Sequence, residues 1–287
     1  MIVIRSKVCG YCGGVRRAVD MALRVAAEGG GPVYSLGPLI HNPAALRVLS
    51  AKGVQPLSVG ELPDRMDGAS VIVRAHGVPP ETLRLLELKG GRVVDATCPR
   101  VKSSQKEAAD FFAKGFVLFL VGERTHAEIV GIAGYAPSGI IVASTEDART
   151  EAERLKAARP DAKVALIAQT TISAQEYGAI AEEIIRFFPD ATVSRTICPA
   201  TADRLAALQD LAAECDALVI VGGRDSANTR RLHTLAVQLG KPAWHIEEVG
   251  ELPEELFGYE RVGLTAGAST PDEVVDAVEA ALTDSMR

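Results

Sequence analysis

The chain has 287 residues, roughly the length of two average domains, and 47% of them are hydrophobic while only 5% are aromatic. Its 31 Lys and Arg against 37 Asp and Glu give a net charge of −6, which argues against nucleic acid as a partner and leaves an anionic substrate to local groups. No apolar run reaches the roughly 18 residues of a membrane helix, and the N-terminal segment is charged too early for a signal peptide. The five cysteines, an odd number, favour a reducing cytoplasm and thiols that are either core filler or metal ligands.

Short runs rich in Val and Ile alternate with longer stretches of helical period along the whole chain. This alternation predicts an α/β fold with mainly parallel sheets. The expected strands are 2–4, 33–35, 71–74, 92–95, 116–121, 140–143, 164–168, 192–196, 217–221, 243–246 and 262–265. Helices are expected between them, for example at 15–27, 101–114, 177–188 and 201–214.

Three cysteines, Cys12, Cys98 and Cys198, each follow an expected strand and precede an expected helix. Proline comes directly after the last two, and proline favours the first position of a helix. A cysteine at a helix N-terminus lies near the positive end of the helix dipole, which favours the metal-binding thiolate. The separations of 86 and 100 residues divide the chain into three units of similar length.

Two further landmarks recur in each unit. A polar residue stands four positions after a glycine that follows a strand, and these pairs are Gly37 with His41, Gly122 with His126 and Gly222 with Ser226. A second polar residue follows another strand, and these residues are His76, Thr170 and Ser269. The repeats predict three similar α/β units at 13–98, 99–195 and 196–287, with the N-terminal strand in 1–12 joining the sheet of the third unit.

The ligands of open parallel sheets collect at the carboxyl ends of strands, beside helix N-termini. If the three units face one another about a pseudo-threefold axis, the three cysteines meet at one centre. Three convergent thiolates suit an iron–sulfur cluster with one open iron better than zinc, which normally takes four ligands. The alternative is three buried thiols at strand ends. Cys9 forms a Cys-x-x-Cys with Cys12, for which disulfide chemistry stays open, and Cys215 is expected in the core.

Polar residues around the cysteines indicate an anion site. Imidazole, hydroxyl and amide donors at helix starts suit phosphate oxygens, and the candidates are His41, His76, His126, Ser226, Asn228 and Ser269. Two of these positions also allow a purely structural role, since 41–43 and 269–273 have the pattern of helix caps. Glu128, two residues after His126, offers an acid for proton transfer, and Thr170 offers a hydroxyl that orients it.

The chain resembles the 4-hydroxy-3-methylbut-2-enyl diphosphate reductase (IspH/LytB) family nearly from end to end. The segments that carry the resemblance are Gly10-Tyr11-Cys12-Gly13-Gly14-Val15, His41-Asn42-Pro43, Ala75-His76-Gly77, Asp95-Ala96-Thr97-Cys98-Pro99, Gln169-Thr170-Thr171, Thr196-Ile197-Cys198 and Thr265-Ala266-Gly267-Ala268-Ser269.

The resemblance implies three α/β domains around a [4Fe–4S] cluster held by Cys12, Cys98 and Cys198, with the substrate hydroxyl on the open iron. It implies that the diphosphate is bound by His41, His76, His126, Ser226, Asn228 and Ser269. The implied catalytic residues are Glu128, Thr170 and His126, and Glu128, assisted by Thr170, would supply the proton that expels water. Two electrons from a ferredoxin- or flavodoxin-like donor would complete a reductive dehydroxylation to isopentenyl and dimethylallyl diphosphate, the last step of the methylerythritol phosphate pathway.

Several positions depart from the family pattern. Ala227 stands where the family usually has a second serine, and Ala127 stands where it has a proline. Ser103 and Gln105 replace a lysine and a histidine, and Leu205 replaces a glutamine. Two alternatives therefore stay open. One is a divergent [4Fe–4S] reductase or dehydratase of another phosphorylated or allylic substrate, and the other is a non-catalytic protein that binds a phosphate ligand.

Overall fold

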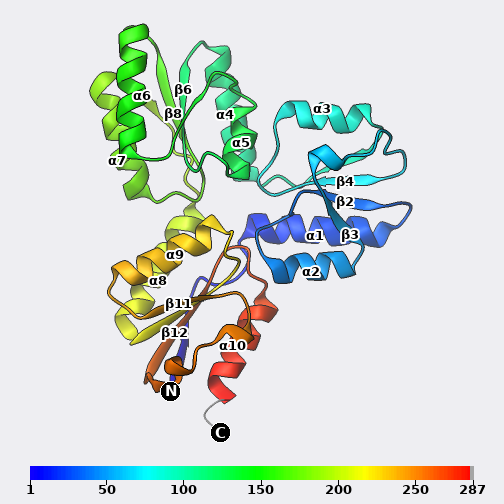
Figure 1. The fold of residues 1–287 in the computed structure, drawn as a ribbon, viewed down its shortest axis with the longest axis vertical. Coiled ribbons are helices and arrows are strands. Elements are labelled where there is room, and N and C mark those ends of the chain that lie inside the picture. The colour runs from blue at the N-terminus through cyan, green and yellow to red at the C-terminus, as the bar shows by residue number, and fades with distance from the viewer. Residues whose placement is uncertain (285–287) are drawn as a thin grey trace. The chain divides into compact units, whose positions relative to one another are not determined.

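The computed structural model describes residues 1–284 and contains three four-stranded sheets with helices between their strands (Figure 1). The strand orders are β3-β2-β4-β5, β7-β6-β8-β9 and β11-β10-β12-β1. Neighbouring strands of the second and third sheets run parallel, as do β2, β4 and β5 of the first. The three sheets therefore follow one plan, and the N-terminal strand β1 takes the fourth place in the third sheet.

The first sheet consists of β2 (Val33–Leu36), β3 (Val54–Leu57), β4 (Ser70–Val73) and β5 (Arg92–Asp95). The second consists of β6 (Val117–Val121), β7 (Ile140–Val142), β8 (Val164–Ala168) and β9 (Thr192–Val193). The third consists of β10 (Ala217–Val221), β11 (Ala243–Ile246), β12 (Arg261–Ala266) and β1 (Ile2–Arg5). The α-helices are α1 (Gly13–Glu28), α2 (Pro43–Ala51), α3 (Pro80–Leu88), α4 (Pro99–Ala113), α5 (Ala127–Ala133), α6 (Thr145–Ala158), α7 (Ala174–Phe187), α8 (Pro199–Glu214), α9 (Ala227–Gln238) and α10 (Asp272–Asp284). Short 3₁₀ turns are η1 (Val59–Glu61), η2 (Val249–Glu251) and η3 (Glu254–Gly258).

The fold confirms the predicted α/β class. Every expected strand is present, and one strand of the structure was not predicted. This strand is β3, which contains Pro56 and therefore lacks the pattern of a strand. Proline is tolerated there because β3 lies at the edge of its sheet. The expected strand 192–196 ends at Val193, because the hydroxyl of Thr196 occupies both backbone groups of Ala168 at 2.9 Å, where a further β9 residue would otherwise pair.

The second sheet is covered by helices on both faces (Figure 1). Alternate residues of β6 point to opposite sides, so Phe119 and Val121 pack with α6 and α7 while Leu118 and Leu120 pack with α4 and α5. All five residues of β6 and of β8 are buried. Burial on both faces explains why these strands are continuous apolar runs.

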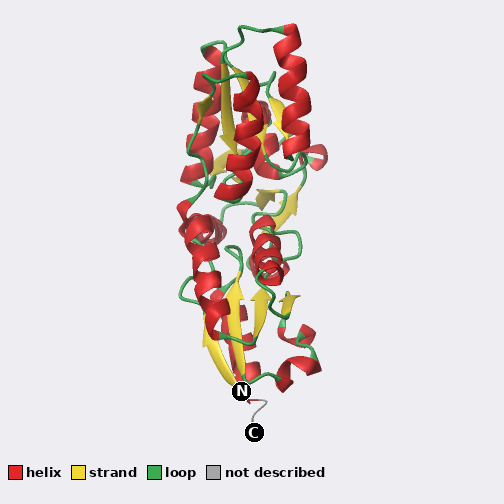
Figure 2. Ribbon diagram, turned by 90° about the vertical axis from the view of Figure 1, so that its left-hand side faces the viewer, coloured by secondary structure: helices red, strands yellow, loops and turns green. Residues whose placement is uncertain are grey.

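The third sheet is built in the same way. Val219 and Val221 of β10 pack with α10, whereas Leu218 and Ile220 pack with α8 and α9. Its outer strand β1 pairs in parallel with β12, and Figure 2 shows the strands of this sheet side by side near the N-terminus.

Contacts divide the chain into two compact units. One comprises 1–27, 38–56 and 199–287, of which 199–284 are described, and the other comprises 28–37 and 57–198. The domain limits 13–98, 99–195 and 196–287 remain a prediction. Within residues 1–284, no helix combines the length and the apolar character needed to cross a membrane.

Candidate functional site

Each of the three candidate ligand cysteines lies at a helix start, and its backbone is fixed by the same hydrogen bond. The N–H groups of Cys98, Cys198 and Cys12 donate to the carbonyls of Ala75, Thr170 and Ala268, at 2.9, 2.9 and 3.0 Å. These carbonyls follow β4, β8 and β12, the third strand in the order of each sheet. The cysteines are partly exposed and free of disulfides. The repeat predicted from the sequence is therefore present in the backbone.

The accepting carbonyls belong to three equivalent turns. In each turn the fourth N–H donates to the first carbonyl, at 3.0 Å in 74–77 and 3.1 Å in 169–172 and 267–270. The third residue of each turn is His76, Thr171 and Ser269. The predicted alignment of Thr170 with His76 and Ser269 is therefore wrong by one residue. Offsets from the cysteines cross loops of unequal length and cannot fix this register.

A second set of equivalent loops follows β2, β6 and β10, the second strand in the order of each sheet. Here the N-cap residues of α2, α5 and α9 are Asn42, His126 and Ser226, and each side chain accepts a backbone N–H of its own first turn. His41 lies one position before the cap, because the loop after Gly37 is one residue longer than those after Gly122 and Gly222. Asn42, rather than the predicted His41, is thus the counterpart of His126 and Ser226.

A buried acid and a threonine are joined by two short hydrogen bonds at the carboxyl ends of the strands of the second sheet. Glu128 is 1% exposed, and its Oε1 accepts the backbone N–H of Thr170 at 2.6 Å. Its Oε2 accepts the hydroxyl of Thr170 at 2.8 Å. The two residues are therefore in direct contact, and their catalytic roles stay a prediction. The same residue, Thr170, also accepts the N–H of Cys198, so the acid and a cysteine are held by one short segment.

Two candidate histidines lie together in the same compact unit. The rings of His76 and His126 are 5.5 Å apart between centroids and nearly perpendicular, at 83°. Nδ1 of His126 accepts the N–H of Glu128 at 3.2 Å. An accepting Nδ1 is unprotonated, so the neutral ring carries its proton on Nε2 and can donate from there.

The edge of the third sheet offers neutral donors instead. Ser226, Asn228 and Ser269 are 6%, 7% and 7% exposed. Ser269 donates its hydroxyl to the carbonyl of His41 at 3.1 Å, and a Cβ on Gly223 would lie 2.4 Å from that oxygen. Nδ2 of Asn228 is buried and has no hydrogen-bond acceptor among residues 1–284. The structure thus brings His41 together with Ser269, and leaves an amide donor of Asn228 available for a ligand.

The other two cysteines lie in the layers of the third sheet. Cys215 is 3% exposed in the core with β10 and α8, as predicted. Cys9 packs against the core that contains α10, and its burial raises the pKa of its thiol, although Arg5 and Arg204 partly counteract this. A raised thiol pKa disfavours the thiolate that disulfide exchange needs.

Comparison with known proteins places these residues in a family. A model of the family described as LytB protein matches residues 3–283. The chain belongs to the LytB family. This confirms the resemblance found in the motifs.

Relatives from this family match over nearly the whole chain. A protein of Treponema denticola named 4-hydroxy-3-methylbut-2-enyl diphosphate reductase is 44% identical over 99% of this chain and 100% of its own. One of Aquifex aeolicus with the same name is 39% identical over 98% and 96%.

Two solved structures share the fold. One is described as (E)-4-hydroxy-3-methyl-but-2-enyl diphosphate reductase, the terminal enzyme of the non-mevalonate pathway, and it matches with a TM-score of 0.73 at 38% identity over 99% of this chain and 100% of its own. The other is E-1-hydroxy-2-methyl-but-2-enyl-4-diphosphate reductase from Plasmodium falciparum, with a TM-score of 0.88 at 25% identity over 96% and 86%.

One supporting residue of this LytB chain was not predicted from the motifs. Gln169 is fully buried, and its Oε1 accepts the N–H of Glu123 at 3.1 Å while its Nε2 donates to Thr171 at 2.8 Å. A Cβ on Gly122 would lie 2.7 Å from the same Oε1. Gln169 therefore ties the loop before His126 to the turn that holds Thr170. In the sequence, Gln169 belongs to the segment Gln169-Thr170-Thr171 that carries the resemblance and directly follows an apolar strand, but neither feature indicates this supporting role.

Proposed function

We propose that this chain reductively dehydroxylates 4-hydroxy-3-methylbut-2-enyl diphosphate to isopentenyl and dimethylallyl diphosphate. The observation that carries the proposal is the full-length similarity, at 44% identity, to a relative named for this activity. The buried pair of Glu128 and Thr170 supplies the acid that such a reaction needs. The five free cysteines fit a reducing compartment, and we propose the cytoplasm.

We infer that Cys12, Cys98 and Cys198 hold a [4Fe–4S] cluster. The donor set fits this group, since three partly exposed cysteines outside any disulfide stand at equivalent backbone positions and thiolates are the natural ligands of iron–sulfur clusters. When bound by three cysteines, the cluster supplies electrons and a Lewis-acidic iron with a free coordination position.

Glu128 and Thr170 move the proton that the leaving hydroxyl requires. With its proton on Oε2, Glu128 donates to Oγ1 of Thr170, and the hydroxyl hydrogen of Thr170 passes to the substrate oxygen. The relay suits the geometry because Oγ1 and Oε2 already share a 2.8 Å hydrogen bond. The carboxyl group is almost fully buried, so its proton would reach the substrate through the hydroxyl of Thr170.

The diphosphate is bound by donors from several loops. His126 donates from Nε2 because its Nδ1 is occupied, and Asn228 donates from its buried Nδ2. The remaining residues that we propose for binding the diphosphate are His41, His76, Ser226 and Ser269, whose hydroxyl would turn from the carbonyl of His41 to a phosphate oxygen. Hydrogen bonds to charged phosphate oxygens are stronger than those to neutral acceptors. Local donors can therefore bind the diphosphate although the net charge of the chain is negative.

The reaction balances with two electrons and two protons. The carbon–oxygen bond of the allylic alcohol breaks, the oxygen leaves as water after taking one proton, and the second proton ends on carbon. The electrons come from a one-electron donor, which we propose is a ferredoxin- or flavodoxin-like protein.

An anaerobic assay tests this proposal. Purified protein is reconstituted with iron and sulfide, and its turnover of the diphosphate is measured with dithionite-reduced viologen. We expect iron bound to the protein and both isopentenyl and dimethylallyl diphosphate as products. An iron-loaded protein without turnover would point to another phosphorylated or allylic substrate, which the exchanges at Ala127 and Ala227 would explain. Protein that binds no iron would leave only a phosphate-binding role.

A further inference from the structure

A buried arginine holds the loop that carries Cys12. Arg204 of α8 is 2% exposed and is among the largest fully buried side chains. Its Nη1 donates to the carbonyls of Ala266 at 2.6 Å and Val8 at 3.4 Å, and its Nη2 donates to that of Gly10 at 2.9 Å. These acceptors are neutral, so they position the loop without balancing the positive charge.

No carboxylate among residues 1–284 pairs with Arg204. Its Nε is also buried without a hydrogen-bond acceptor in that part of the chain. Burial lowers the pKa of Arg204, and the groups whose charge opposes this are the thiols of Cys9 and Cys12. A buried charge is costly unless an opposite charge compensates it. A thiolate of Cys12, the proposed cluster ligand, is therefore the negative charge that can balance this guanidinium.

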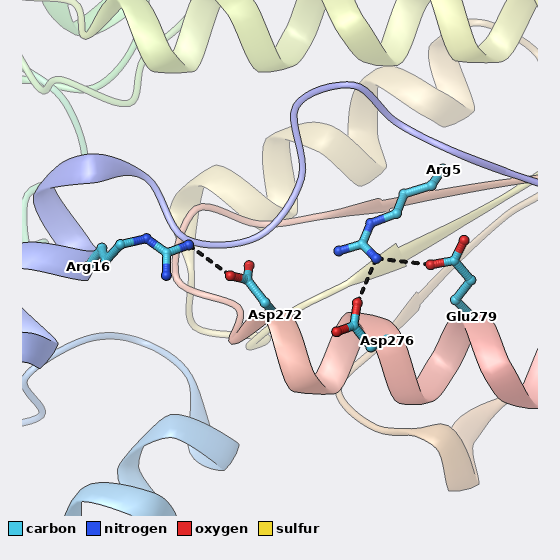
Figure 3. A network of polar contacts seen from close by, with 5 residues as sticks. All are labelled: Arg5, Arg16, Asp272, Asp276 and Glu279. Carbon is cyan, nitrogen blue, oxygen red and sulfur yellow. Dashed lines mark hydrogen bonds and ion pairs between the residues drawn. The ribbon is translucent and has the colours of Figure 1, made fainter.

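Other arginines of the same compact unit are paired with acids of α10, as Figure 3 shows. Arg5 donates to Asp276 at 2.6 Å and to Glu279 at 2.9 Å. Arg16 donates to Asp272 at 2.8 Å, and its side chain is 52% exposed. Arg16 stands only four residues after Cys12, yet a carboxylate and water balance its charge. Burial without an acidic partner thus sets Arg204 apart from both.

We propose that Arg204 is a positioning residue whose buried positive charge balances the cluster on the side of Cys12. The inference rests on the proposed function, because it requires the cluster. Three thiolates outweigh the charge of the oxidised cube, so the assembly is anionic, and reduction makes it more so. A buried cation nearby therefore favours the reduced form and raises the reduction potential.

The test compares reconstituted Arg204→Gln, Arg204→Lys and Arg16→Gln with the wild type. At one applied potential, the ratio of reduced to oxidised cluster is measured by electron paramagnetic resonance and visible absorption, without substrate. We expect this ratio to fall about tenfold in Arg204→Gln, which corresponds to ~59 mV for one electron. Arg204→Lys keeps the charge, and Arg16→Gln removes a paired and exposed one, so both should stay within about twofold of the wild type.

Each result decides for or against this role. An unchanged ratio in Arg204→Gln, or a fall of equal size in Arg204→Lys, overturns the inference while leaving the proposed function intact. If Arg204→Gln takes up no iron, Arg204→Lys decides: a loaded protein with the ratio of the wild type supports the role of charge, and an iron-free protein refutes it. A wild type that binds no iron ends both the inference and the proposed function.

Discussion

At the carboxyl ends of their strands, the second and third sheets have edges that share one backbone plan but carry different side chains. The second edge is formed by the loop 122–128 and the turn 169–172, and the third by the loop 222–228 and the turn 267–270. In both, a capping residue starts a helix and a buried residue follows two positions later, which is Glu128 in one and Asn228 in the other. The turns differ as well, with Gln169 matched by Gly267.

The two edges have the same backbone frame but different chemical roles. Hydrogen bonds between backbone groups fix the two edges alike, so the side chains at equivalent positions are free to differ in chemistry. The second edge holds the acid and its threonine, whereas the third holds hydroxyl and amide groups that do not titrate. We therefore expect substitutions of Glu128 and Thr170 in the second edge to lower turnover, and those in the third edge to weaken binding of the substrate.

The largest effect is expected from the cysteines, one of which is held by the equivalent turn of each of the three sheets. Replacing Cys98 or Cys198 with serine should remove the bound iron and abolish turnover, because a hydroxyl is a poor substitute for a thiolate ligand. Iron and sulfide content per chain, measured after anaerobic reconstitution, checks this. Cys215→Ala is the matched control, since Cys215 lies in the core, and it should keep its iron. Full iron content in Cys98→Ser would remove that residue from the ligand set.

Glu128→Gln should come next. The variant keeps the shape of the side chain but has no proton to give, so turnover should fall by about 10²–10⁴-fold. The iron content and the visible spectrum should match those of the wild type. Unchanged turnover at any pH between 6 and 9 would mean that another group is the acid.

Replacing the two neighbouring threonines separates the relay from its scaffold. Thr170→Val loses the hydroxyl that passes on the proton, together with its hydrogen bond to Glu128, so turnover should fall by roughly 10–100-fold. The hydroxyl of Thr171 accepts from Gln169 instead, so Thr171→Val should change turnover by no more than about threefold. Equal losses in the two variants would contradict the relay.

Asn228→Ala probes the third edge at the position equivalent to Glu128. Loss of one amide donor to a charged oxygen should raise KM about tenfold while kcat stays nearly constant. Steady-state kinetics under anaerobic conditions distinguishes the two constants. A fall in kcat with unchanged KM would place Asn228 in the chemical step and break the division of roles between the edges.

The smallest effect concerns a histidine that supports the third edge from β11. Nε2 of His245 contacts the carbonyl of Gly222 at 2.7 Å, and burial lowers the pKa of its ring below the ordinary 6.5. The unfolded chain therefore takes up a proton first, and stability is lost as pH falls through 6.5. Urea unfolding at pH 7.5 and 5.5 should show a smaller loss in His245→Gln than in the wild type. An identical pH dependence in both would show that His245 does not titrate on unfolding.

The parts that the sequence predicts well are those in which local pattern and burial agree. Central strands such as β6, β8 and β10 are buried on both faces, so they are unmistakable apolar runs. The cysteine-led helix starts were equally clear, because Cys98 and Cys198 precede proline at the first helical position.

The parts that escaped prediction depend on tertiary context. The cap pattern of 41–43 is confirmed, but loop length makes Asn42 rather than His41 the counterpart of His126 and Ser226, and spacing alone cannot show it. The alignment of His76 with Thr171 rests on a turn hydrogen bond that the motif does not display. Arg204 was the least predictable residue, since an arginine on a helix is normally exposed and the sequence around it does not indicate its almost complete burial.

The position of β1 also affects how the molecule is made. Residues 2–5 pair with residues 261–264, so β1 is synthesised long before the strand with which it pairs. The first and second sheets join segments that are synthesised close together, and they can close earlier. An affinity tag fused before Ile2 would adjoin an edge strand that pairs on one side only, and a bulky N-terminal fusion would therefore delay or weaken the last sheet to form.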